Sequence, residues 1–116
     1  MTQLGLVAAL TLTACATSAS APTATESAFC GGVVALDGVS SPGGPQDPTP
    51  AEMRTYAGQV AAPIRDLQSN SPARIAGPVG AVVAGIDKAK SGDTAALGDD
   101  YGAARASVEG WVFDHC

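Results

Sequence analysis

Few side chains in this sequence are spaced as catalytic or metal-binding groups are. The C-terminal run Asp114-His115-Cys116 contains three possible metal ligands, but consecutive residues rarely converge on one ion and no second group of ligands accompanies them. Asp99 and Asp100 are adjacent, so on a helix they would point about 100 degrees apart and would not form an acid and base pair. His115 is the only histidine, and no nucleophile or phosphate-binding glycine motif accompanies it. We therefore predict no catalytic residue, no metal site and no cofactor.

The first residues indicate export. Residues 4–14, "LGLVAALTLTA", are uncharged and largely apolar, and the run is about half as long as a membrane-spanning helix requires. This length is typical of the apolar core of a signal peptide, which we predict over residues 1–14. No Lys or Arg follows Met1 ahead of the run, which departs from the usual pattern and would fit a start upstream of Met1.

Cys15 has the neighbours of a lipidated cysteine. Leu12, Thr13, Ala14 and Cys15 resemble the bacterial lipobox, in which a branched apolar residue and two small residues precede the cysteine that receives diacylglycerol. We predict lipid attachment at Cys15, with two or three acyl chains binding the protein firmly to a membrane. The alternatives are an ordinary signal peptide cleaved near Ala14 and a chance match. The predicted location is the outer face of the cell membrane, or otherwise the secreted fraction.

The rest of the chain divides into a tether and one small domain. After Cys15, the stretch up to residue 28 is mostly Ala, Ser and Thr, a composition that favours a disordered tether over 15–28. Residues 29–116 suffice for one domain with one core. The net charge is -5 and the six basic residues are scattered, which argues against nucleic acid as a partner.

Four segments repeat apolar residues at intervals of three and four, the pattern of one helix face. Thr49-Pro50-Ala51-Glu52 predicts a capping box at the start of the second helix, and Pro63 should kink that helix without ending it. Asn70 should close it, and Asp93 should cap the fourth helix. Short connections then favour an all-α, antiparallel four-helix (up-down-up-down) bundle. The four apolar stripes are Phe29, Val33, Leu36; Met53, Tyr56, Val60, Ile64, Leu67; Ile75, Val79, Val82, Ile86, Ala89; and Leu97, Tyr101, Ala104, Val108, Trp111.

Cys30 and Cys116 remain once Cys15 is assigned to lipid. They begin the first helix and end the fourth, and an up-down-up-down bundle brings these ends together. We predict a Cys30–Cys116 disulfide, with free thiols or an intermolecular bridge as the alternatives. Closing a loop of about 86 residues would stabilise the domain by roughly 4.5 kcal/mol.

The combination of "LTAC", an Ala/Ser/Thr/Pro tether, an opening "FC" and a closing "HC" resembles the small alanine-rich lipoproteins and secreted proteins of high-GC Gram-positive (actinobacterial) bacteria. The proteins that this chain resembles have no generally assigned activity. The resemblance leads us to expect a non-enzymatic envelope lipoprotein that acts as an interaction or scaffold module, with the membrane and an envelope protein as partners. The alternative is an exported small-molecule-binding protein with a pocket opened by kinks at Pro63 and Pro78. On the last helix we expect Arg105 to pair with Glu109 on the exposed side, and either Val112 or Phe113 to be an exposed contact.

Overall fold

The computed structural model describes residues 23–116, and within this range the chain is all-helical, with no β-strand. The helices are α2 (Ala24–Asp37), α3 (Pro50–Gln59), α4 (Ala61–Asn70), the short 3-10 helix η1 (Ala73–Ile75), α5 (Ala76–Lys90) and α6 (Asp99–His115). The predicted all-α class is thus confirmed, with five α-helices in place of the expected four. Cys15 and the predicted signal peptide lie outside the described residues.

The first helix begins earlier than expected. Thr23 and Glu26 form a capping box: Thr23 Oγ1 accepts a hydrogen bond from the Glu26 amide at 3.0 Å, and the Thr23 amide donates to Glu26 Oε1 at 2.9 Å. Residues 24–28 are therefore the first turn of α2, and their assignment to the disordered tether is wrong. The capping signal "TATE" was present but was masked by the Ala-rich composition around it.

Pro63 ends a helix, where we had expected a kink. Because Pro63 has no amide hydrogen to donate to the Gln59 carbonyl, and its ring crowds that carbonyl, the hydrogen-bond ladder cannot continue unbroken. The chain leaves helical geometry at Val60 (φ -98°, ψ 5°), which ends α3 and starts α4. The predicted capping box of Thr49 and Glu52 is confirmed by hydrogen bonds of 2.8 and 3.1 Å.

The other predicted boundaries are mostly correct. Asn70 is the last residue of α4, and a short 3-10 turn precedes α5, in whose first turn Pro78 lies. The exception is Asp93, which caps a turn and no helix. Its Oδ1 accepts a hydrogen bond from the Ala95 amide at 2.9 Å, and α6 starts only after Gly98.

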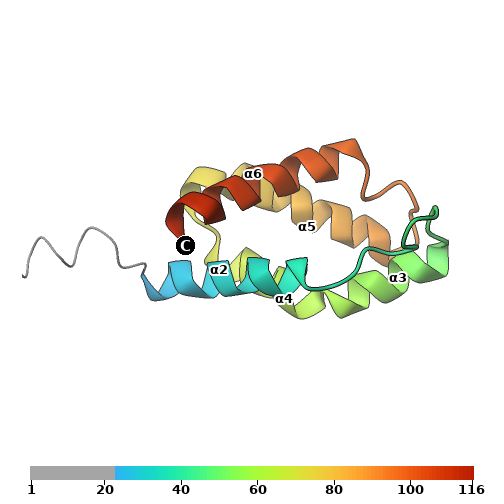
Figure 1. Cartoon of the computed structure of the whole chain (residues 1–116), viewed down its shortest axis with the longest axis horizontal. Helices are drawn as coiled ribbons and strands as arrows, with labels where there is room; N and C mark the ends of the chain where they lie inside the picture. Colours follow the sequence, from blue (N-terminus) through green and yellow to red (C-terminus); the bar gives the residue numbers. More distant parts are fainter. Residues whose placement is uncertain (1–22) are drawn as a thin grey trace, which may run out of the picture.

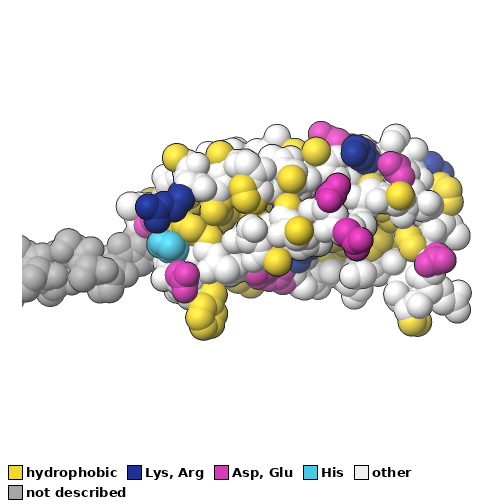
Figure 2. All heavy atoms as spheres, turned by 90° about the horizontal axis from the view of Figure 1, so that it is seen from above, with side chains coloured by type: hydrophobic (Ala, Val, Ile, Leu, Met, Phe, Trp, Pro, Cys, Tyr) yellow, Lys and Arg dark blue, Asp and Glu magenta, His cyan; other side chains and the backbone are white. Residues whose placement is uncertain are grey.

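The core consists of the predicted stripes. All stripe residues except Leu97 are buried, and Ala57 is a buried residue that the stripes did not include. Helix α2 packs mainly on α4, α3 on α5, and α5 on α6. Close approach requires glycine at two positions: a Cβ on Gly32 would lie 2.9 Å from Leu67 Cδ1, and one on Gly85 would lie 2.6 Å from Tyr101 Cδ1. On the face seen in Figure 2, apolar side chains form separate spots among polar ones.

The molecule has two distinct ends (Figure 1). The described chain enters at the end where α2 begins and α6 finishes. At the opposite end lie the loop 38–49, which joins α2 to α3, and the segment 91–98, which joins α5 to α6.

Candidate functional site

A cavity of about 440 Å³ lies at the loop end of the molecule, between loop 38–49, α3, segment 91–98 and α6. A second hollow of about 310 Å³ lies against the same loop, and Ser41, Pro42 and Tyr56 border both. Neither hollow lies where the expected kinks at Pro63 and Pro78 would open a pocket. The hollow beside the α3–α4 break measures only about 130 Å³.

The shape of loop 38–49 requires glycine at two positions. Gly43 (φ +81°) and Gly44 (φ +57°) are both in the left-handed region, and a Cβ on Gly43 would lie 2.6 Å from the Gln46 carbonyl oxygen. The Gln46 amide donates a hydrogen bond to the Gly43 carbonyl at 3.0 Å. The loop thus turns back over the start of α3, where the Thr49 cap begins the helix that carries Met53 and Tyr56 to the cavity.

Arg105 is the one charged residue among those that line the cavity. Its Nη1 donates a hydrogen bond to the Tyr101 hydroxyl oxygen at 3.1 Å, one helical turn earlier on α6. Its Nη2 donates to Asp37 Oδ1, at the end of α2, and lies 3.5 Å from Glu109 Oε2. The predicted Arg105–Glu109 pair is thus present, but the Arg105 side chain is only 23% exposed and belongs to a larger cluster.

The surroundings of this cluster change the proton affinity of Tyr56 and Glu109. Burial, reinforced by the neighbouring Tyr101, raises the pKa of Tyr56 to about 12, so its hydroxyl stays protonated at neutral pH. Burial and the nearby Asp37 carboxylate raise the pKa of Glu109, although Arg105 opposes this shift. Arg105 therefore contacts two carboxylates. Their negative charges offset the positive charge of Arg105 beside the cavity.

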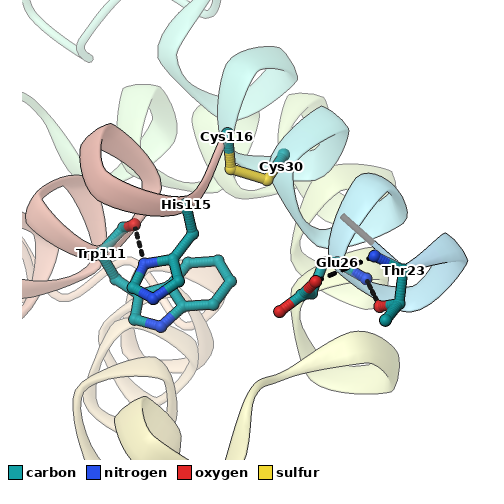
Figure 3. Close-up of a disulfide and its surroundings, with 6 residues drawn as sticks. All are labelled: Thr23, Glu26, Cys30, Trp111, His115 and Cys116. Carbon is teal, nitrogen blue, oxygen red and sulfur yellow. Dashed lines mark hydrogen bonds between the residues drawn. A yellow bond between two sulfur atoms is a disulfide. The ribbon is translucent and has the colours of Figure 1, made fainter. Parts of the chain in front are cut away.

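The other end of the molecule holds the disulfide (Figure 3). Cys30 on α2 and Cys116 after α6 are bonded, with their Cα atoms 6.2 Å apart, which confirms the predicted pair. His115 stacks on Trp111 with ring centroids 4.2 Å apart, and its Nδ1 lies 2.8 Å from the Trp111 carbonyl oxygen. Trp111 in turn meets the Phe29 ring edge-on at 5.5 Å.

The candidate metal and acid-base residues do not form a site. In the part of the chain from residue 23 onward, no three His, Cys, Asp or Glu side chains are grouped as ligands for a metal ion. Asp99 and Asp100 are exposed in the first turn of α6, where their negative charges interact favourably with the helix dipole. Of the predicted contact residues, Phe113 is 89% exposed while Val112 packs against the core.

Sequence reasoning identified the disulfide but missed the cavity and the Asp37–Arg105 contact. Tyr101 and Arg105 are four apart, so their contact could have been read from helix spacing. Asp37 is far away in the sequence, and only the packing of α2 near α6 brings it to Arg105.

Comparison with known proteins adds no assignment: no protein-family model matches this chain, and neither a curated protein nor a solved structure matches it. Between residues 23 and 116, none of the helices has the length and apolar character needed to cross a membrane.

Proposed function

We propose that this protein is a lipid-anchored protein of the cell envelope whose helical domain is a non-enzymatic interaction module. The observation that carries the proposal is the Cys30–Cys116 disulfide, because such bonds form and persist in exported proteins. The disulfide also accounts for two of the three cysteines and leaves Cys15, in its lipobox-like setting, for the lipid. The proposal places the protein with the small alanine-rich lipoproteins of actinobacterial type.

The position of Cys15 would set how the domain faces the membrane. Cys15 precedes Thr23, where α2 is capped, by only eight positions, so even a fully extended chain would span at most about 28 Å. The disulfide end would then lie near the membrane, and loop 38–49 with the cavity would point away from it (Figure 1). Phe113, one turn before Cys116, would be an apolar contact on the membrane-near part of the domain.

We also propose that the helices form an antiparallel four-helix (up-down-up-down) bundle in which α3 and α4 act as one bent helix. The packing of α2 on α4, α3 on α5 and α5 on α6 supports this arrangement. So does the single residue, Val60, that separates α3 from α4. Nuclear Overhauser contacts between the ends of neighbouring helices would test it.

The proposed partners are the membrane and an envelope protein, and nucleic acid is not among them. Acidic side chains outnumber basic ones, and the face in Figure 2 shows no large cluster of Lys and Arg. Catalysis is not proposed either, because the one histidine stacks on Trp111 and contacts the backbone of its own helix.

The test is the intact mass of the protein from the membrane fraction of its native host, measured with and without reduction. We expect a mature chain that begins at Cys15, is heavier by two or three acyl chains, and gains two hydrogens on reduction. A Cys15→Ala variant is the matched control and should lose the acyl mass while keeping the disulfide. A full-length cytosolic chain with three free thiols would overturn the proposal.

A second candidate function, binding of a small molecule, is favoured by the cavity under loop 38–49. Its volume of about 440 Å³ falls in the range of small-molecule sites, and both tyrosines named above, Tyr56 and Tyr101, line it. Binding of any small molecule that shifts the nuclear magnetic resonance signals of the cavity residues would support this function.

A further inference from the structure

We infer that the cavity under loop 38–49 takes an uncharged, ring-sized molecule that carries a hydroxyl or carbonyl group. This inference rests on the second candidate function above and names the chemical class of its ligand. It depends on three observations: the apolar part of the wall, the polar groups at the Arg105 side, and the balance of charge around Arg105.

The apolar part of the wall favours a molecule with an apolar body, and the polar residues Ser41, Gln46 and Thr94 line the rest of the cavity. Pro42 and Pro48 come from the loop, Met53 from α3 and Leu97 from the segment before α6. None of these side chains offers a hydrogen-bond donor. A ring placed against them would exchange contact with water for contact with carbon, the ordinary source of affinity in small-molecule sites.

The polar groups favour one hydrogen-bonding substituent on that body. Arg105 carries five N–H donors in a fixed planar arrangement. The structure gives hydrogen bonds from Nη1 to Tyr101 and from Nη2 to Asp37, so the guanidinium is held in place with donors to spare. A hydroxyl or carbonyl oxygen of a ligand can accept from such a preorganised donor, and Tyr56 is among the residues that line the same cavity.

The charge balance argues against an ionised ligand. Arg105 faces the carboxylates of Asp37 and Glu109, so one cation is opposed by two carboxylates beside the cavity. A ligand carboxylate would lose hydration on entry without meeting a net positive field. A ligand ammonium would lose hydration in the same way, and the one charged residue that lines the cavity is a cation, Arg105. An uncharged molecule avoids both costs.

The experiment compares three molecules with the same 4-methylphenyl body: p-cresol, which is neutral at pH 7, 4-methylbenzoate and 4-methylbenzylamine. Each is titrated into the ¹⁵N-labelled full chain at pH 7, and the amide shifts of loop 38–49 and segment 91–98 are followed. We expect p-cresol to shift these amides and to saturate, and each charged molecule to bind at least about ten-fold more weakly.

A pair of variants locates the binding. Gly102 and Gly110 are both exposed on α6 with open space where a Cβ would lie, but only Gly102 lines the cavity. Gly102→Leu should weaken p-cresol binding at least about ten-fold, whereas Gly110→Leu should change it less than two-fold. Both variants should keep the unfolding temperature of the parent chain or exceed it, because Leu is a better helix former than Gly.

The outcomes separate the two claims. Charged molecules that bind as tightly as p-cresol would refute the uncharged class while leaving the binding function in place. If none of the three shifts the cavity amides, the small-molecule function fails together with the inference. Unchanged p-cresol binding to Gly102→Leu would show that it binds elsewhere, which also overturns the inference.

Discussion

Removal of the Cys30–Cys116 disulfide should strongly destabilise the domain. The bond closes a loop with a sequence separation of 86, and the chain-entropy relation gives an unfolded-state entropy loss of about 15 cal/mol/K, or about 4.5 kcal/mol at 25 °C. Cys116 is exposed and Cys30 is only partly buried, so replacement by Ser removes little packing. The constraint on the unfolded chain is therefore expected to dominate the loss.

The assay is urea unfolding of the oxidised chain, of the double variant Cys30→Ser/Cys116→Ser, and of the parent chain kept reduced. For a domain of this size we expect the free energy of unfolding to fall by about 4 kcal/mol and the melting temperature by roughly 20–30 °C. The urea dependence should become steeper, because the unfolded chain without the crosslink exposes more surface. The reduced parent chain should behave as the double variant does.

A loss below about 1 kcal/mol would refute this reasoning, since it would mean that the ends of α2 and α6 stay together in the unfolded chain without the bond. A reduced parent that is much more stable than the double variant would show instead that Ser disturbs packing at Cys30.

Three further substitutions have stability effects that we predict from particular contacts. Gly85→Ala would place a Cβ 2.6 Å from the buried Tyr101 ring, so we expect a loss of about 1–2 kcal/mol in urea unfolding after the gain in helix propensity is subtracted. Gly110→Ala, in open space on α6, should instead stabilise by about 0.5–1 kcal/mol, and an equal effect of the two substitutions would contradict the close contact at Gly85. For Tyr56 the folded pKa of about 12 exceeds the ordinary 10, so its contribution to stability is complete below pH 10 and is lost between pH 10 and 12. Tyr56→Phe should lose less stability than the parent from pH 9 to pH 11, and a parallel loss in both chains would disprove the role of this hydroxyl.

Helix-face periodicity predicted nearly the whole core because burial in a helical domain follows directly from local spacing. Phe29, Met53 and Val82 are examples of residues placed correctly in this way. Leu97 is an exception, since α6 starts only at Asp99 and Leu97 lies in the segment before it. The break at Val60 was missed because the apolar pattern stays on one face across the break while Pro63 interrupts the hydrogen bonds.

The candidate site was far less predictable. The cysteine pair could be inferred because two helix ends and two remaining cysteines limit the possibilities. The cavity depends on how an irregular loop with two left-handed glycines folds over α3, and no periodic pattern encodes that shape. The Asp37–Arg105 contact joins residues 68 positions apart, and it follows from packing alone.

The two links between α2 and α6 differ in kind, one covalent and one an ion pair, and this difference predicts where the domain opens. Midway along α2, at Cys30, a covalent bond holds the helix to the end of α6, whereas at its last residue α2 is held by the Asp37–Arg105 ion pair. The Asp37 side chain is 40% exposed, and pairs at such positions contribute about 1 kcal/mol or less. Local opening should therefore start at the cavity end, which would admit a ligand without unfolding the domain.

Amide hydrogen exchange tests this difference in opening between the two parts of α2. In the oxidised chain, the amides of residues 35–38 should exchange faster than those of residues 29–33, although both groups lie in the same helix or at its cap. Reduction should narrow this difference, because it removes the covalent link at Cys30 and keeps the Asp37–Arg105 pair. Uniform protection along α2 in the oxidised chain would contradict this reasoning. It would show that the packing of α2 on α4, and not its links to α6, determines the local stability of α2.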